Sequence, residues 1–251
     1  MSALNLDSLR PDIRTRIEPF FREILSSHPD GIHALAVTGS AVTPDFEENT
    51  SNINSVILLN TMSLDFVRFL APLGSKYRAN RLAAPLVMTA AYAEKSLDVF
   101  PVEFLDLKLL HKIVFGADIF GALNIHPEHL RMQCEREIKS RLLALWQGYI
   151  VDLGRKDAVT ALLIRSVKGM FPLFRGLLLL RDAEPPIARH DVIAAVEKHF
   201  PVERDVLEQV LSFSHQKAKL SDDAVYTAFE RHYRNLQIIS DSIESFSSST
   251  R

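Results

Sequence analysis

The pair Gly39-Ser40 has residue types that could bind phosphate, and Asn52 with Asn54 has a spacing that would bring two side chains together beside it. A glycine-serine bend presents backbone N–H groups and a hydroxyl, which can donate hydrogen bonds to phosphate oxygens. Asn52 and Asn54 stand at positions i and i+2 of an extended segment, so their side chains project to the same face. The spacing therefore predicts two amides that point together near a tight turn.

Two apolar runs must position these pairs. The run Ala34–Val37 ends at the Gly39-Ser40 bend, and the run Val56–Leu59 begins just after Asn54. Short apolar runs bounded by turn residues are typical of buried strands. We therefore expect a strand, a tight bend, a polar loop and a second strand, in that order.

The segment Ser51-Asn52-Ile53-Asn54, with Gly39-Ser40 and a spacer before it, resembles the motif of the nucleotidyltransferase fold superfamily, as in the kanamycin and minimal nucleotidyltransferases. The signature of that family is Gly-Ser, a spacer, and Asp-x-Asp at the start of a strand, often within Ser-Asp-Ile-Asp. This chain keeps the Gly-Ser, the spacer, Ser51 and Ile53. It has Asn52 and Asn54 at the positions of the family's two metal-binding aspartates.

The resemblance implies metal-assisted transfer of a nucleotide monophosphate. In the family, Mg²⁺ ions bind the carboxylates and hold the nucleotide triphosphate. The residues that correspond to Gly39 and Ser40 also contact the triphosphate. A third carboxylate lies on a neighbouring strand. The segment Phe100–Leu107 reads as a fourth strand, so Glu103 is our first candidate for that carboxylate and Asp106 the second. The alternative is that each is an ordinary exposed carboxylate.

The two asparagines change this chemistry. Mg²⁺ binds anionic oxygens in near-octahedral geometry, and in catalysis it neutralises charge on the attacking and leaving oxygens. Each lost carboxylate charge is worth on the order of several kcal/mol at metal-ligand distance. We expect weak or absent Mg²⁺ binding at Asn52 and Asn54 and impaired or lost nucleotidyl transfer. A nucleotide-binding or regulatory role through Gly39 and Ser40 could remain.

Two alternatives stay open. The chain could be an active Mg²⁺-dependent nucleotidyltransferase that uses Glu47 or Glu48 with Glu103, and transfers a nucleotide monophosphate to a small-molecule or protein hydroxyl. Asp45 belongs to the same acidic loop but more often caps a local turn. The chain could instead be a non-catalytic protein-interaction module whose helical domain binds a protein partner.

A basic cluster follows the expected fourth strand. It consists of Lys108, His111 and Lys112. These side chains could meet phosphate, or they could form a solvated face. The sequence favours the second interpretation.

We expect two domains with a boundary near residue 125. In residues 1–125, strand and helix patterns alternate, with Leu82–Met88 as a third strand and residues 112–125 as a connection. From His126 onward helical spacing dominates. The fold class is therefore α+β, with a nucleotidyltransferase-like mixed β-sheet domain at 1–125 followed by an α-helical bundle domain at 126–251. In the family, such a helical domain closes over the nucleotide or acceptor.

The amino-acid composition restricts which binding partners and which cellular compartment we expect. The chain has 251 residues, a formal net charge of −2 and 47% hydrophobic residues, so it can bury real cores and gives no general reason to bind nucleic acid. Its single cysteine, Cys134, excludes an internal disulfide and suits a reducing compartment. No apolar run is long enough to cross a bilayer. We predict a cytoplasmic protein without a membrane partner and leave its oligomeric state open.

Overall fold

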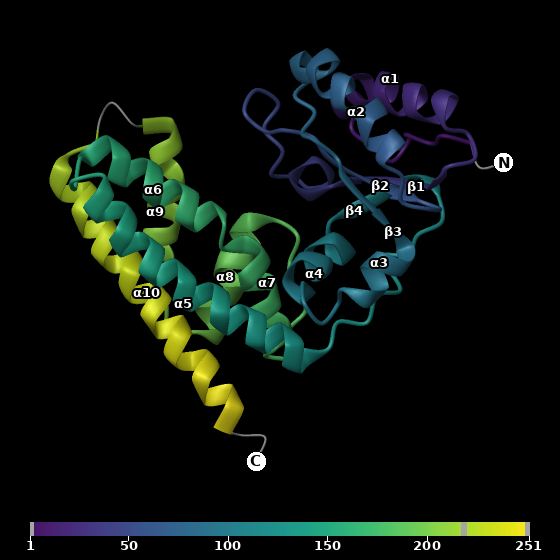
Figure 1. The fold of residues 1–251 in the computed structure, drawn as a ribbon. Helices are drawn as coiled ribbons and strands as arrows, with labels where there is room; N and C mark the ends of the chain where they lie inside the picture. Colours follow the sequence, from purple (N-terminus) through teal and green to yellow (C-terminus); the bar gives the residue numbers. More distant parts are fainter. Residues whose placement is uncertain (1–2, 217–219, 249–251) are drawn as a thin grey trace. The chain divides into compact units, whose positions relative to one another are not determined.

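The computed structural model describes residues 3–216 and 220–248. The chain forms two compact units, Met1–Ile125 and His126–Arg251 (Figure 1). The first unit contains the sheet, and the second is built from helices. Among the helices of the described residues, none has the length and apolar character needed to cross a membrane.

A four-stranded mixed sheet forms the centre of the first unit, with strand order β3-β2-β1-β4. Strand β1 pairs antiparallel with β2 and with β4, whereas β2 pairs parallel with β3. The strands are β1 (Ile32–Thr38), β2 (Asn54–Leu59), β3 (Leu86–Thr89) and β4 (His111–Gly116). Strands β1 and β2 are buried along nearly their whole length, as the continuous apolar runs predict.

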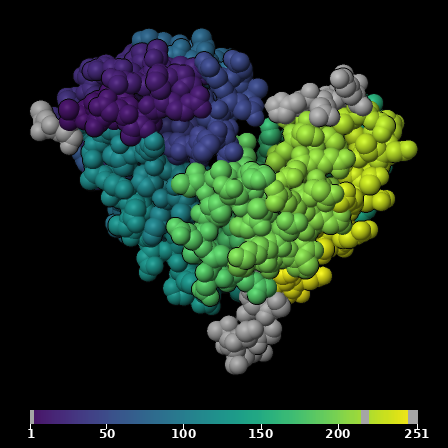
Figure 2. Space-filling view, turned by 180° about the vertical axis from the view of Figure 1, so that it is seen from behind, coloured from purple at the N-terminus to yellow at the C-terminus, as the bar shows by residue number. Residues whose placement is uncertain are grey.

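Helices α1 (Pro11–Ser27) and α2 (Leu64–Lys76) cover one face of the sheet. Their apolar stripes form a single core with side chains of the sheet, including Ile17, Phe21, Leu35, Ile57 and Leu70. Figure 1 shows helices α3 (Ala90–Lys95) and α4 (Pro101–Leu109) on the other side. In the space-filling view, α1, in purple, lies on the outer surface of the unit (Figure 2). The central strands are thus shielded from solvent on both faces.

The prediction of a strand at Phe100–Leu107 is wrong. This segment is the helix α4, which begins with a proline at its first position, where the fixed φ of the ring and the missing N–H favour a helix start. In a strand Glu103 and Leu105 would share a face, but Glu103 is exposed and Leu105 is only 3% exposed. A helix separates these two residues, because its period is 3.6 rather than 2.

The fourth strand, β4, instead occupies part of the segment that reads as a connection. Gly116 ends this strand with a φ of +80°, and a Cβ built at Gly116 would lie 2.0 Å from the carbonyl oxygen of His33. Only glycine permits so close an approach to the backbone of β1. Gly116 therefore lies in a close pairing of β4 with β1. From the sequence alone, this glycine suggests a loop.

The second unit contains helices α5 to α10 within the described residues. The long helix α5 packs against α10, α6 and α7. Near the start of α9, Arg231 of α10 pairs with Glu203 and Asp205, while the Asn235 side chain binds the backbone of Glu203 through both its oxygen and its nitrogen. The helices are α5 (Pro127–Val151), α6 (Lys156–Lys168), α7 (Phe171–Leu179), α8 (Arg189–His199), α9 (Arg204–Gln216) and α10 (Asp222–Ser248).

Candidate functional site: the bend after the first strand

The bend after β1 is a short 3₁₀ turn, Gly39–Val42. Gly39 has a φ of +68°, in the left-handed region that favours glycine. Its N–H donates to the carbonyl oxygen of Leu110 at 3.0 Å, so the bend is fastened to the end of α4. The carbonyl oxygen of Ser40 accepts hydrogen bonds from both the N–H and the hydroxyl of Thr43, at 3.0 Å each. Hydrogen bonds to Leu110 and from Thr43 therefore hold the backbone of the bend in place.

Asn54 lies beside this bend. It pairs with Thr38 across β1 and β2, and a Cβ built at Gly39 would lie 3.3 Å from the Asn54 side-chain nitrogen. Asn52 and Asn54 are exposed, whereas Ile53 between them is 1% exposed and Ser55 is 4% exposed. This alternation places both asparagines on the same, accessible face at the start of β2. Among the described residues, neither asparagine side chain forms a hydrogen bond, so both are available to a ligand.

The backbone around these asparagines is also anchored. The N–H of Ile53 donates to the carbonyl oxygen of Arg81 at 2.9 Å, and the N–H of Ala83 donates to the carbonyl oxygen of Ile53 at 3.0 Å. Burial of the Ile53 side chain adds a second constraint. The spacing between Asn52 and Asn54 is therefore set by the fold and not by a ligand.

No carboxylate occurs on any of the four described strands. The two strands that flank β2 are β1 and β3, and their residues are aliphatic, Ala, Met, Thr or His. Glu103, our candidate for a third carboxylate on a strand, lies instead on the exposed side of α4, and Asp106 is partly buried on the same helix. The prediction that Glu103 lies on a strand is therefore wrong, and the role of Glu103 as a metal ligand stays a prediction.

The acidic loop before β2 is occupied with other contacts. Glu48 forms an ion pair with Arg16 of α1, with 3.1 Å between Oε1 and Nη2. Glu47 accepts a hydrogen bond from the Thr50 hydroxyl. The N–H of Asp45 donates to the Thr43 hydroxyl at 3.2 Å. Nowhere in residues 3–216 and 220–248 do three or more His, Cys, Asp or Glu side chains form a group that could hold a metal ion.

These donors do not fit the Mg²⁺ that the resemblance implies. The Gly39 N–H is already bonded to Leu110, so the bend offers the Ser40 hydroxyl, and the start of β2 offers two neutral amides, whereas proteins usually hold Mg²⁺ through carboxylates and substrate phosphates. A phosphate group fits the same donors well, because amide and hydroxyl hydrogens donate directly to its oxygens. The arrangement is suited to hold phosphate rather than a divalent cation.

The basic cluster near the bend has intramolecular partners. Lys108 donates to the carbonyl oxygen of Leu123 at 2.7 Å, and Lys112 donates to the carbonyl oxygen of Ser8 at 2.5 Å. His111 pairs with Thr38 across β1 and β4, so it flanks the bend on the side opposite Asn54. These contacts position the cluster within the fold, and they reduce its availability to phosphate.

The His111 ring is fixed at both nitrogens, by the carbonyl oxygen of Leu107 at 2.8 Å and by Asp118 at 3.1 Å. Burial acts to raise the pKa of Asp118, but hydrogen bonds from the Gly121 N–H, from His111 and from the Phe120 N–H outweigh burial and lower this pKa. Sequence reasoning placed His111 only in the basic cluster after the expected fourth strand, because the rest of β4, from residue 112 onward, was read as a connection. The proximity of His111 to Thr38 follows from the pairing of β1 with β4, which the sequence does not reveal.

Comparison with known proteins supports the fold. No model of a known protein family matches the sequence, and no curated protein matches it either. Among solved structures, the chain is similar to spectinomycin adenyltransferase AAD(9) from Enterococcus faecialis, which was solved with ATP and spectinomycin. The TM-score is 0.55 at 10% sequence identity, and the similarity covers 90% of this chain and 98% of the other. The chain therefore has the fold of a nucleotidyltransferase, across both its sheet and its helices.

Proposed function

We propose that the first unit binds a nucleoside triphosphate through the Gly39-Ser40 bend and the Asn52 and Asn54 amides, and that this binding does not depend on Mg²⁺. The proposed role is nucleotide binding or regulation, with metal-dependent nucleotidyl transfer impaired or lost. The observation that carries the proposal is the pair of accessible neutral amides beside the bend, in a sheet whose described strands have no carboxylate. The ATP in the similar adenyltransferase supports the choice of ligand.

The sign of the charge near the phosphates determines whether a cation is needed for binding. Two carboxylates beside a triphosphate repel it, and a divalent cation must lie between them to reverse that repulsion. Asn52 and Asn54 remove the repulsion. Their NH₂ groups can donate hydrogen bonds directly to phosphate oxygens, which the carboxylate of an aspartate cannot do. Asparagine in place of aspartate therefore weakens metal binding. It also removes the need for a metal ion in phosphate binding.

A thermal-shift measurement tests this proposal. ATP should raise the melting temperature of the native chain equally with Mg²⁺ and with EDTA, since a ligand stabilises the state to which it binds. Asn54→Asp should reduce the shift in EDTA. Asn60→Asp is the matched control, because it adds the same charge roughly 20 Å away at the other end of β2. Each shift is measured from the variant's own ligand-free melting temperature, because Asn60 donates to the carbonyl oxygen of Asp30. Equal losses in both variants would count against the proposal.

The active-enzyme alternative requires Glu47 or Glu48 to act with Glu103. Glu48 would have to leave Arg16, and Glu47 would have to leave Thr50. If the chain transfers a nucleotide monophosphate to a small-molecule or protein hydroxyl in the presence of Mg²⁺, Glu103→Gln should reduce that activity. An activity that Glu103→Gln leaves unchanged would exclude this arrangement.

A protein partner is a second candidate, and exposed apolar side chains near the end of α5 favour it. Leu143, Trp146 and Ile150 follow helical spacing and share a face, and they are 66%, 47% and 67% exposed. Contiguous exposed apolar surface marks interaction sites. We expect Ile150→Glu to abolish binding of such a partner and to leave the ATP-induced thermal shift intact.

A further inference from the structure

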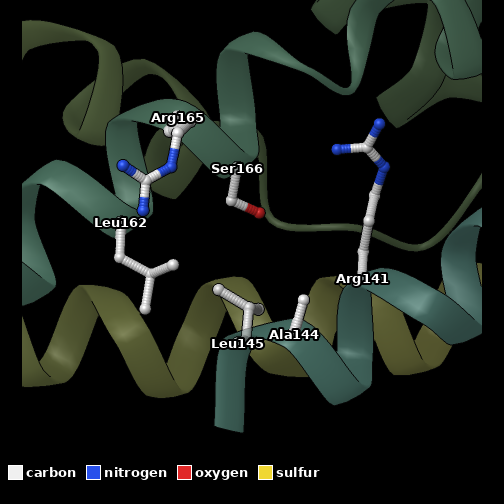
Figure 3. A pocket seen from close by; sticks show the side chains of 6 residues that line it. All are labelled: Arg141, Ala144, Leu145, Leu162, Arg165 and Ser166. Carbon is white, nitrogen blue, oxygen red and sulfur yellow. The ribbon is translucent and has the colours of Figure 1, made fainter. Parts of the chain in front are cut away.

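The second unit contains a pocket of about 140 Å³ between α5 and α6, far in sequence from the bend (Figure 3). One part of its wall is apolar, and the rest carries two guanidinium groups and a hydroxyl. The lining residues are Arg141, Ala144 and Leu145 from α5, and Leu162, Arg165 and Ser166 from α6. A small pocket with two cationic side chains is a candidate anion site.

Arg141 has a charge that the fold compensates poorly. Its Nε is buried and has no hydrogen-bond partner among the described residues. The nearest carboxylate, Glu137, is 3.9 Å from Nη2. Burial lowers the pKa of Arg141 despite the opposing effect of Glu137. An anion in the pocket that Arg141 lines would balance the charge that Glu137 alone compensates only weakly.

Arg165 supplies the second cation. Its side chain is exposed, and no carboxylate of the described residues lies within ion-pair distance of it. Figure 3 shows Arg141 and Arg165 on either side of Ser166. Guanidinium groups bind oxyanions through paired N–H donors. The pocket that both arginines line, with a volume of about 140 Å³, has room for one small anion.

Ser166 completes the pocket, and His232 of α10 orients its hydroxyl. The Ser166 Oγ lies 2.9 Å from the His232 Nε2, and His232 is fully buried. The His232 Nδ1 has no hydrogen-bond partner among the described residues. Burial, followed by the positive charge of Arg141, lowers the pKa of His232 to about 4, so the ring is neutral at physiological pH.

The neutral ring can carry its hydrogen on either nitrogen. A hydrogen on Nδ1 would be a buried N–H without an acceptor, which is rarer in proteins than a buried acceptor without a donor. We therefore assign the hydrogen to Nε2, which donates to the Ser166 oxygen. The Ser166 hydroxyl hydrogen is then free to donate into the pocket.

We propose that the pocket formed by Arg141, Arg165 and Ser166 binds a phosphate group, either as inorganic phosphate or as the terminal group of a phosphate monoester. Two guanidinium groups on opposite sides and a hydroxyl match a tetrahedral dianion, which presents acceptor oxygens in several directions. The volume of the pocket suits a single phosphate group rather than a nucleotide. This site is independent of the bend in the first unit and of the function proposed for it.

Calorimetric titration of the full chain with inorganic phosphate, and in parallel with glycerol phosphate, tests the proposal. Arg165→Gln should weaken binding about tenfold or more, since it removes a charge-assisted contact. Arg165 is exposed, so this variant should fold. Lys168→Gln is the matched control: it removes the same charge from an exposed position of α6 that does not line the pocket. It should bind phosphate as the native chain does.

A second variant acts on Arg141 without replacing it. A Cβ built at Gly169 would lie 2.8 Å from the Arg141 Nη1, and Gly169 has a helical φ of −75° that alanine adopts easily. Gly169→Ala should therefore displace the guanidinium and weaken phosphate binding. Binding of one phosphate compound only, with the same dependence on Arg165, would identify its source and still support the site.

Three results would overturn the proposal. The native chain could fail to bind either compound at millimolar concentration. Arg165→Gln and Lys168→Gln could weaken binding equally, which would indicate a diffuse charge effect. Phosphate binding could be lost in Asn54→Asp and kept in Arg165→Gln, which would place it at the bend.

Discussion

Gly39 has two independent constraints, its left-handed φ and the approach of the Asn54 amide. Gly39→Ala should therefore lower the free energy of unfolding by about 1–2 kcal/mol, the cost of a left-handed conformation for a residue with a Cβ. Gly74→Ala provides the control, because a Cβ at that position meets nothing within 4 Å and the residue lies inside α2. That change should stabilise the chain by up to about 1 kcal/mol. Denaturant unfolding of both variants would reveal the opposite signs, and equal effects would contradict the assigned geometry.

His232 should make stability depend on pH. Its pKa is lowered from 6.5 to about 4 in the folded state, chiefly by burial, so protonation favours the unfolded chain. The corresponding stability is fully present above pH 6.5 and is lost as the pH falls toward 4. The loss should reach roughly 3 kcal/mol.

Denaturant unfolding between pH 7 and pH 4 measures this effect. His232→Gln should flatten the pH dependence over that range, whereas His190→Gln should not, because the His190 side chain is 71% exposed. A wild-type pH dependence that survives in His232→Gln would show that other groups cause it.

Among the elements, α4 shows where pattern reading fails. Val102 and Phe104 fit a strand period, whereas Pro101, Phe104 and Leu105 fit a helix period, so the choice depends on Leu105, whose burial the sequence does not reveal. The error moved the fourth strand to the wrong segment and placed Glu103 on it. By contrast, the two continuous apolar runs around the bend could be recognised directly, because strands covered on both faces need no alternation.

Leu105 also offers a test of α4. Leu105→Ala should lower the free energy of unfolding by about 2–4 kcal/mol, since it opens a cavity in the core. Leu86→Ala, which truncates a 50% exposed leucine of β3, should cost less than about 1 kcal/mol. Chemical denaturation of both variants distinguishes the two cases, and similar costs would contradict the observed burial.

At the scale of the whole molecule, the chain shares the fold of an adenyltransferase at 10% identity while it lacks carboxylates on its described strands. The sequence indicated two strands of the sheet through continuous apolar runs, and the helical segment through helical spacing. It also indicated the bend and the amides through their spacing. It could not reveal the pocket at Arg141 and Ser166, because contacts among α5, α6 and α10 join residues that are up to 91 positions apart, from Arg141 to His232.

The retained fold and the altered donors together favour phosphate binding without a cation. Backbone anchoring at Ile53 and at Gly39 keeps the asparagines beside the bend whether or not a ligand is present. Such pre-organisation lowers the cost of binding, because little conformational freedom remains to be lost. It also means that aspartates introduced at these two positions would occupy the same places.

The most direct measurement is the affinity for ATP by calorimetry, in EDTA and in Mg²⁺, of the native chain and of the Asn52→Asp/Asn54→Asp variant. We predict that the native chain binds ATP with similar affinity in both buffers, and that the variant loses about tenfold or more in EDTA and regains binding with Mg²⁺. Native binding that requires Mg²⁺, or a variant that binds in EDTA as the native chain does, would contradict the account.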